Sequence, residues 1–152
     1  MLEALASLSS NRVSVDELWP LYPHKKNRFR EMALTEPLIG EDTLEAVRTL
    51  SGLPMAVVTS SGQTEIEPIL RRYGLLERMT TCVYGGDVTA LKPDPAPYLL
   101  AKQRLGVDHA VAFEDSAAGI ASASAAGCVV VEVQAASELP ELIRQHVMAR
   151  IG

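Results

Sequence analysis

The sequence predicts an α/β protein with a doubly wound parallel sheet, in which helices cover both faces of the strands. The first observation behind this prediction is that short apolar runs alternate with longer helical patterns from about residue 37 onward. The second is that the apolar runs are continuous rather than alternating, which is typical of parallel strands buried on both faces. The third is size, because 152 residues with 47% hydrophobic side chains can bury the core of one ordinary domain.

Residues 1–36 form a separate region with a helical pattern and no strand-like run. Ser14 is expected to begin a helix, since Glu17 stands three residues later and completes a capping box. Pro20 and Pro23 are expected to break or kink this helix. We therefore expect a small helical part, 1–36, before the main α/β part, 37–152.

Helices and strands alternate through residues 37–152, and several of the expected helices end at a glycine, which favours a helix C-terminus. The expected helices are 41–50, 63–73 with an interruption near Pro68 and a stop at Gly74, 96–105 before Gly106, 117–126 before Gly127, and 137–150. The expected strands are 55–59, 81–84, 110–113 and 129–133.

Charge and hydropathy exclude several classes of partner. A net charge of −5 argues against nucleic acid, and the basic run 24–30 is expected to be the solvated face of a helix. No apolar stretch reaches the ~18 residues that a membrane span needs, and residues 1–11 lack the pattern of a signal peptide. Cys82 and Cys128 have no metal-ligand spacing, so we expect buried free thiols and a cytoplasmic protein.

The turn Thr59-Ser60-Ser61-Gly62 follows the apolar run 55–58 and is the first candidate site. A hydroxyl and several free backbone N–H groups at a strand-to-helix turn can bind an anion, helped by the helix N-terminus. The alternative is ordinary turn chemistry, because serine and glycine are common in any turn.

Lys92 is the second candidate and lies in the proline-rich segment 91–97. Pro93 biases the backbone of Lys92 toward an extended conformation, and the neighbouring prolines stiffen the loop. A lysine on a stiff loop can hold a fixed positive charge against a phosphate. The alternative is a solvated surface lysine.

Glu114 and Asp115 are the strongest local signal, because they follow the apolar run 110–113 at the expected carboxyl end of a strand. Ligands of open α/β sheets bind at this end, and adjacent carboxylates suit a hard divalent cation. Two carboxylates repel each other unless a cation or backbone donors compensate. The alternative is that Asp115 or Ser116 simply caps the next helix.

Together, and in this order, the three segments resemble the second, third and fourth motifs of the haloacid dehalogenase superfamily of phosphohydrolases. The pattern Glu-Asp-Ser-x-x-Gly is similar to its β-phosphoglucomutase-like and sugar-phosphatase branch, to which phosphoglycolate phosphatases are closely related. The matching stretches are 55–61, 91–95 and 113–120.

This resemblance implies a Rossmann-like core at 37–152 and a remnant of a helical cap at 1–36. It implies a phosphatase or phosphomutase that needs Mg²⁺ and acts on a small phosphorylated metabolite. Thr59, with Ser60, would contact the phosphoryl group, and Lys92 would neutralise its charge. Glu114 and Asp115 would bind Mg²⁺.

The family's first motif, an Asp-x-Asp pair that supplies the nucleophile, has no match in the 152 residues. Without a carboxylate nucleophile the covalent route is lost, so we expect the chain as written to be truncated and inactive or nearly so. The family's central first strand would be missing too, which predicts a rearranged sheet or a homo-oligomer that closes the gap. The alternative function is a non-catalytic module that binds phosphate or metal without turnover.

Overall fold

The computed structural model describes residue 20 and residues 22–147, and the chain divides into two compact units between Leu38 and Ile39. The first unit contains helix α3 (Tyr22–Thr35), which includes the basic run 24–30. His24 and Arg28 are exposed on this helix, as expected for a solvated face. Pro23 lies in the first turn of α3, where its missing N–H is tolerated. The expected helix start at Ser14 lies outside the described residues.

The second unit alternates strands and helices in the predicted order, which confirms the α/β class. Its helices are α4 (Glu41–Thr49), α5 (Gln63–Arg72), α6 (Ala96–Leu105), α7 (Ala117–Ala125) and α8 (Leu139–His146). Its strands are β1 (Ala56–Val58), β2 (Thr81–Val83), β3 (Val111–Glu114) and β4 (Val129–Glu132). Short 3₁₀ turns are η2 (Leu76–Arg78), η3 (Gly85–Asp87) and η4 (Ala136–Glu138).

The strands form two separate parallel pairs rather than one sheet. β1 pairs with β2, with Val57 opposite Cys82, and β3 pairs with β4, with Ala112 opposite Val130. Among the described residues no strand pairing joins β1 with β3. In the described part of the chain β1 and β3 therefore each keep one edge unpaired, and they have not paired directly with each other.

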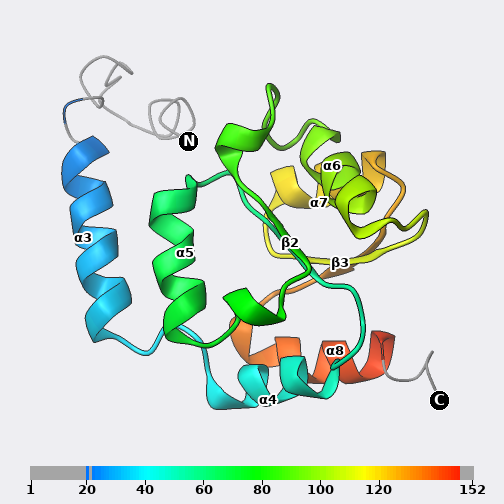
Figure 1. Ribbon diagram of the computed structural model, residues 1–152, viewed down its shortest axis with the longest axis horizontal. Helices are drawn as coiled ribbons and strands as arrows, with labels where there is room; N and C mark the ends of the chain where they lie inside the picture. The colour runs from blue at the N-terminus through cyan, green and yellow to red at the C-terminus, as the bar shows by residue number, and fades with distance from the viewer. Residues whose placement is uncertain (1–19, 21, 148–152) are drawn as a thin grey trace. The chain divides into compact units, whose positions relative to one another are not determined.

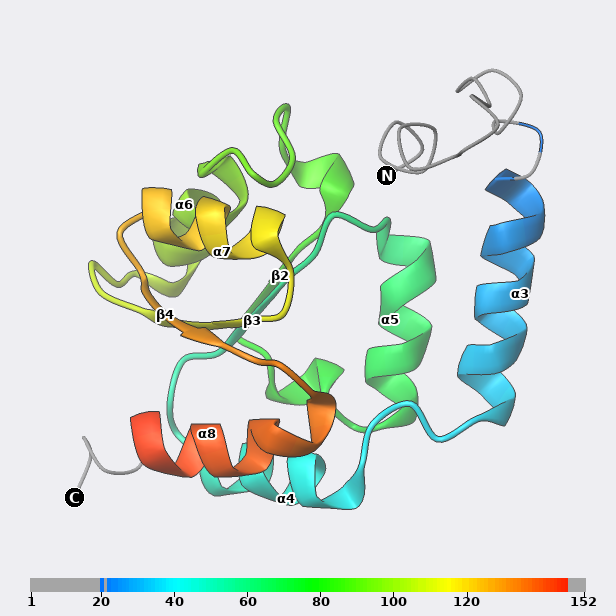
Figure 2. The ribbon, with the colours of Figure 1, turned by 180° about the vertical axis from the view of Figure 1, so that it is seen from behind.

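Helices cover the strands on two sides (Figures 1 and 2). α6 and α7 lie on one side, where Tyr98 of α6 packs with three small residues from β3 and from the α7 region, Ala112, Ala123 and Ala126. α4 and α8 lie side by side on the other, where Leu50 packs against Ile143. The predicted site residues lie at the carboxyl ends of β1 and β3 and on the loop before α6. No helix in the described part of the chain is long and apolar enough to cross a membrane.

Three details differ from the sequence-based expectations. α5 continues through Pro68, because its buried face, with Leu70 packed against Leu44 and Leu75, outweighs the loss of one helix hydrogen bond. The last helix begins only at Leu139, since Pro140 fits the first turn of a helix better than its interior. Cys82 and Cys128 are free as expected, but they are partly rather than fully buried.

Candidate phosphate and cation site

Lys92 is held inside the second unit rather than in solvent. Its side chain is 11% exposed, and its Nζ donates hydrogen bonds to the Val58 carbonyl, at 3.0 Å, and to Glu114 Oε1. The loop that carries Lys92 is tied to α7, because Ser122 Oγ donates to the carbonyl of Asp94 at 2.6 Å. The alternative of a solvated surface lysine is therefore wrong here. Lys92 connects the end of β1 with the end of β3, across the two unpaired edges.

Glu114 is the last residue of β3, and its carboxylate points inward with 7% of the residue exposed. Its Oε1 accepts hydrogen bonds from the Lys92 ammonium and the Tyr98 phenol, and its Oε2 accepts one from Ser116 Oγ at 3.3 Å. Burial alone would raise the pKa of Glu114, but the bonds from Lys92 and Tyr98 and the charge of Lys92 outweigh it and hold the pKa below its ordinary value. Glu114 is therefore an ionised carboxylate whose oxygens are already bound.

The first turn of α7 packs directly on this carboxylate. A Cβ at Gly119 would lie 1.9 Å from Glu114 Oε2, so a larger residue at this position would displace the carboxylate from where it lies. Ser116 is the N-cap of α7, and its Oγ accepts a hydrogen bond from the Gly119 N–H at 3.1 Å. Of the two residues that the capping alternative offered, the structure selects Ser116. Asp115 is not the N-cap of α7.

Asp115 is exposed and borders a hollow of about 240 Å³. The other residues that line it come from the end of β3, from the segment after β4 and from the start of α8: Phe113, Val133, Gln134, Ala135, Ala136 and Leu139. Of the adjacent pair of acids, one carboxylate is thus buried and bound, and the other faces outward.

A Mg²⁺ ion takes oxygen ligands in near-octahedral geometry. Asp115 offers an exposed carboxylate, whereas the Glu114 oxygens are engaged by Lys92, Tyr98 and Ser116. Within the residues that the structure describes, no cluster of three His, Cys, Asp or Glu side chains could hold a metal ion. These residues do not form a complete cation site by themselves, and the assignment of Glu114 and Asp115 as metal ligands stays a prediction.

The Thr59 turn lies next to Val58, the residue whose carbonyl binds Lys92. The Thr59 N–H donates to the Val83 carbonyl at 2.9 Å, which fixes the turn to the end of β2. Two of the backbone N–H groups that were expected to be available for an anion already donate hydrogen bonds within the protein. The Ser61 N–H donates to Thr59 Oγ1 at 3.1 Å, and the Gly62 N–H donates to Glu65 Oε2 at 3.0 Å. The Thr59 hydroxyl and the exposed Ser60 are the groups that remain for a ligand.

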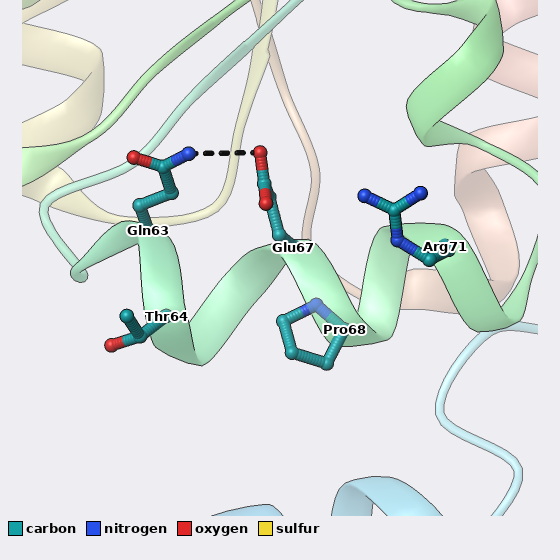
Figure 3. A pocket seen from close by; sticks show the side chains of 5 residues that line it. All are labelled: Gln63, Thr64, Glu67, Pro68 and Arg71. Carbon is teal, nitrogen blue, oxygen red and sulfur yellow. Dashed lines mark hydrogen bonds between the residues drawn. The ribbon is translucent and has the colours of Figure 1, made fainter.

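A larger hollow, of about 410 Å³, lies along α5 and contains none of the predicted site residues. Figure 3 shows the five side chains that line it, with a hydrogen bond of 3.0 Å from Gln63 Nε2 to Glu67 Oε1. The chemistry-bearing residues predicted from the sequence gather elsewhere, at the ends of β1 and β3.

Tyr98 is a residue of this site that the sequence analysis did not find. It comes from α6 and is 8% exposed, with its ring in the core beside Ala112 and its O–H on Glu114. A single tyrosine on an apolar helix face is typical of core packing. Only the structure shows that this phenol reaches the end of β3.

The fold and the site define an α/β protein with a fixed lysine at the carboxyl ends of its parallel strands, a place where such proteins bind anions. A family model, haloacid dehalogenase-like hydrolase, matches residues 11–127 of the chain. The chain belongs to the haloacid dehalogenase-like hydrolase family, and it is similar to a phosphoglycolate phosphatase of Escherichia coli, with 34% identity over 89 residues.

Relatives of known name support this membership. A phosphorylated carbohydrates phosphatase of Thermotoga maritima is 37% identical over 109 residues, which are 70% of this chain and 50% of the relative. The fructose-1-phosphate phosphatase YqaB of Escherichia coli is 35% identical over 136 residues, covering 86% of this chain and 70% of that protein. These names do not favour the alternative of a non-catalytic module.

The fold comparison agrees. The crystal structure of a β-phosphoglucomutase from Clostridium difficile superposes with a TM-score of 0.61 at 21% identity, covering 91% of this chain and 66% of that one. The chain spans about half the length of the first relative it matches. The fold predicted from the three motifs is therefore confirmed.

Proposed function

We propose that this chain holds the phosphate of a small phosphorylated metabolite, of the sugar-phosphate class, and supplies part of the site of a phosphohydrolase or phosphomutase. The observation that carries the proposal is the position of Lys92. An ammonium has three N–H donors, and the structure engages Lys92 Nζ with Val58 and Glu114. One donor remains for a ligand oxygen, beside the turn that presents the Thr59 hydroxyl.

The roles of the residues follow from what phosphoryl transfer requires. The reaction depends mainly on positioning and on neutralising the charge of the transferring group. Lys92 supplies a fixed positive charge, and Thr59 and Ser60 supply hydroxyl donors at the end of β1. The names of the relatives, which act on phosphorylated carbohydrates and on fructose 1-phosphate, support the same substrate class.

We also propose that Asp115, with Glu114 behind it, belongs to a Mg²⁺ site. Its exposed position beside the start of α7 supports a ligand role. Since the described residues offer a single outward carboxylate at this point, further oxygen ligands must come from water, substrate or another segment.

The first test is phosphate release from p-nitrophenyl phosphate with and without Mg²⁺, together with calorimetric titration of inorganic phosphate. We expect phosphate to bind and no release to occur, because the 152 residues contain no Asp-x-Asp pair to act as nucleophile and acid. The control is Asp115→Ala. Mg²⁺-dependent release that this substitution abolishes would show that another carboxylate serves as nucleophile, and failure to bind phosphate would overturn the proposed function.

We propose further that two copies of the chain associate through the unpaired edges of β1 and β3. The supporting observation is that each of these strands has a partner on one side only. Unpaired strand edges favour association with another chain. Sedimentation velocity over a range of protein concentrations should show a growing dimer fraction, whereas a monomer at every concentration would contradict this proposal.

The partly buried free thiols of Cys82 and Cys128 support a location in a reducing compartment, and we propose the cytoplasm.

A further inference from the structure

Tyr98 acts on Lys92 in two ways. Its ring lies 5.1 Å from Lys92 Nζ, measured to the ring centroid, which is within the range of a favourable cation–π contact. Its O–H donates to Glu114 Oε1, the same oxygen that accepts a hydrogen bond from Lys92. The phenol and the ammonium thus meet at one atom, and the aromatic face lies against the ammonium.

This arrangement matters because a lysine side chain is long and flexible. A lysine that binds phosphate as a point charge is effective only when its Nζ is held in place. In this chain the fixed points are the Val58 carbonyl and Glu114 Oε1. The Val58 carbonyl is part of the backbone, but Glu114 Oε1 is at the end of a side chain and needs to be fixed itself.

Three neighbours fix the Glu114 carboxylate apart from Lys92. Ser116 Oγ binds Oε2 at 3.3 Å, Gly119 leaves room for the carboxylate, and Tyr98 binds Oε1. The bond from Ser116 is the longer one, and the Ser116 oxygen also accepts the N-cap bond from Gly119. Tyr98 is rigid by comparison, because its ring is buried in the core between α6 and α7.

We propose that Tyr98 is a positioning residue of the phosphate site: it holds the Glu114 carboxylate turned inward, and through it directs the Lys92 ammonium toward the ligand. The consequence for phosphate binding rests on the proposed function. The orientation of Lys92 does not, and it can be measured without any ligand. In this arrangement Glu114 anchors the lysine, and Asp115 is the acid of the pair that faces outward.

The test compares Tyr98→Phe with Tyr84→Phe. Each change removes one buried phenol oxygen and keeps the ring. Tyr84 is 6% exposed, and its O–H has no hydrogen-bond partner among the described residues. The two variants therefore differ in whether the lost oxygen binds Glu114.

Two readouts are needed. The first is the Kd of inorganic phosphate, which should rise about tenfold in Tyr98→Phe, as expected for loss of a hydrogen bond to a charged group, and stay within twofold in Tyr84→Phe. The second is the NMR signal of the Lys92 side-chain ammonium in a ¹⁵N-labelled sample without phosphate, assigned by its loss in Lys92→Met. We expect this signal to shift or broaden in Tyr98→Phe only.

Each outcome decides the proposal. An unchanged Lys92 signal in Tyr98→Phe overturns it, even if the melting temperature falls, because a purely structural tyrosine would lower stability alone. A changed signal with an unchanged phosphate Kd also overturns it. If the wild type does not bind phosphate, the proposed function fails separately, and the Lys92 signal alone decides whether Tyr98 orients the lysine.

Discussion

Replacing Lys92 with methionine is expected to lower the free energy of unfolding by about 3 kcal/mol, because it leaves a buried carboxylate without its charged partner. The Lys92 and Glu114 side chains are 11% and 7% exposed, so water can do little to replace the ammonium. Tyr98 and Ser116 still donate to Glu114, which keeps the loss near the lower end of what broken buried pairs cost. Urea denaturation measures the change.

Lys102→Met is the matched control. Lys102 Nζ also donates to a backbone carbonyl, that of Ala126 at 3.0 Å, but no carboxylate partner is found for it among the described residues. The loss of this bond should lower the free energy of unfolding by about 1.5 kcal/mol and leave phosphate binding unchanged, whereas Lys92→Met should abolish phosphate binding.

Adding Glu114→Gln to Lys92→Met should restore part of the lost stability, because a neutral amide tolerates burial better than a carboxylate. Additive losses in the double variant would contradict the coupling.

The effect of Lys92→Met should depend on pH. Since the pKa of folded Glu114 lies below its ordinary value, the pair stabilises the protein above the usual carboxyl pKa of about 4.3. This contribution is lost as the pH falls through the folded pKa and the carboxylate takes up a proton. The stability difference between wild type and Lys92→Met should therefore shrink below about pH 4. A difference that stays constant from pH 7 to pH 3 would show that the charge of Glu114 is not its cause.

Much of the fold could be predicted because its signals are local. Continuous apolar runs predicted all four strands of the second unit, and glycines such as Gly106, with a φ of +68°, marked where helices end. The interruption predicted near Pro68 was wrong, because proline acts as a local signal, whereas the helix around it is stabilised by the tertiary contacts of Leu70. In the described part of the chain β1 pairs only with β2, and apolar runs alone do not determine which strands become neighbours.

The candidate site was predictable in its backbone positions but not in its contacts. The apolar runs predicted Thr59 and Glu114 at strand ends and the prolines predicted Lys92 on a stiff loop, and the structure brings Lys92 and Glu114 together beside Val58. The sequence analysis predicted the same ligand role for Glu114 and Asp115, because the pattern of two adjacent carboxylates does not show which of them is buried. The alternation of side chains along β3 turns Glu114 inward onto Tyr98 and leaves Asp115 outside, and that distinction depends on three-dimensional neighbours.

A second large effect is expected for Gly85→Ala, in the turn after β2. A Cβ at Gly85 would lie 2.3 Å from the Ser60 carbonyl oxygen and 3.0 Å from its carbon, both backbone atoms that cannot rotate away. The Gly85 N–H also donates to the Ser61 carbonyl at 2.9 Å. The added methyl group must therefore separate η3 from the Thr59 turn and break this bond. We expect a loss of about 2 kcal/mol in the free energy of unfolding.

Gly86→Ala is the control, since it adds the same methyl group one residue later, where no atom lies within 4 Å. Its stability should stay within about 0.5 kcal/mol of wild type. The two variants should differ in function as well. Moving the Thr59 turn away from β2 shifts the Thr59 hydroxyl proposed to contact the phosphate, so Gly85→Ala should weaken phosphate binding and Gly86→Ala should not. Equal stability and equal phosphate affinity in the two variants would show that the contact between Gly85 and Ser60 does not hold the turn in place.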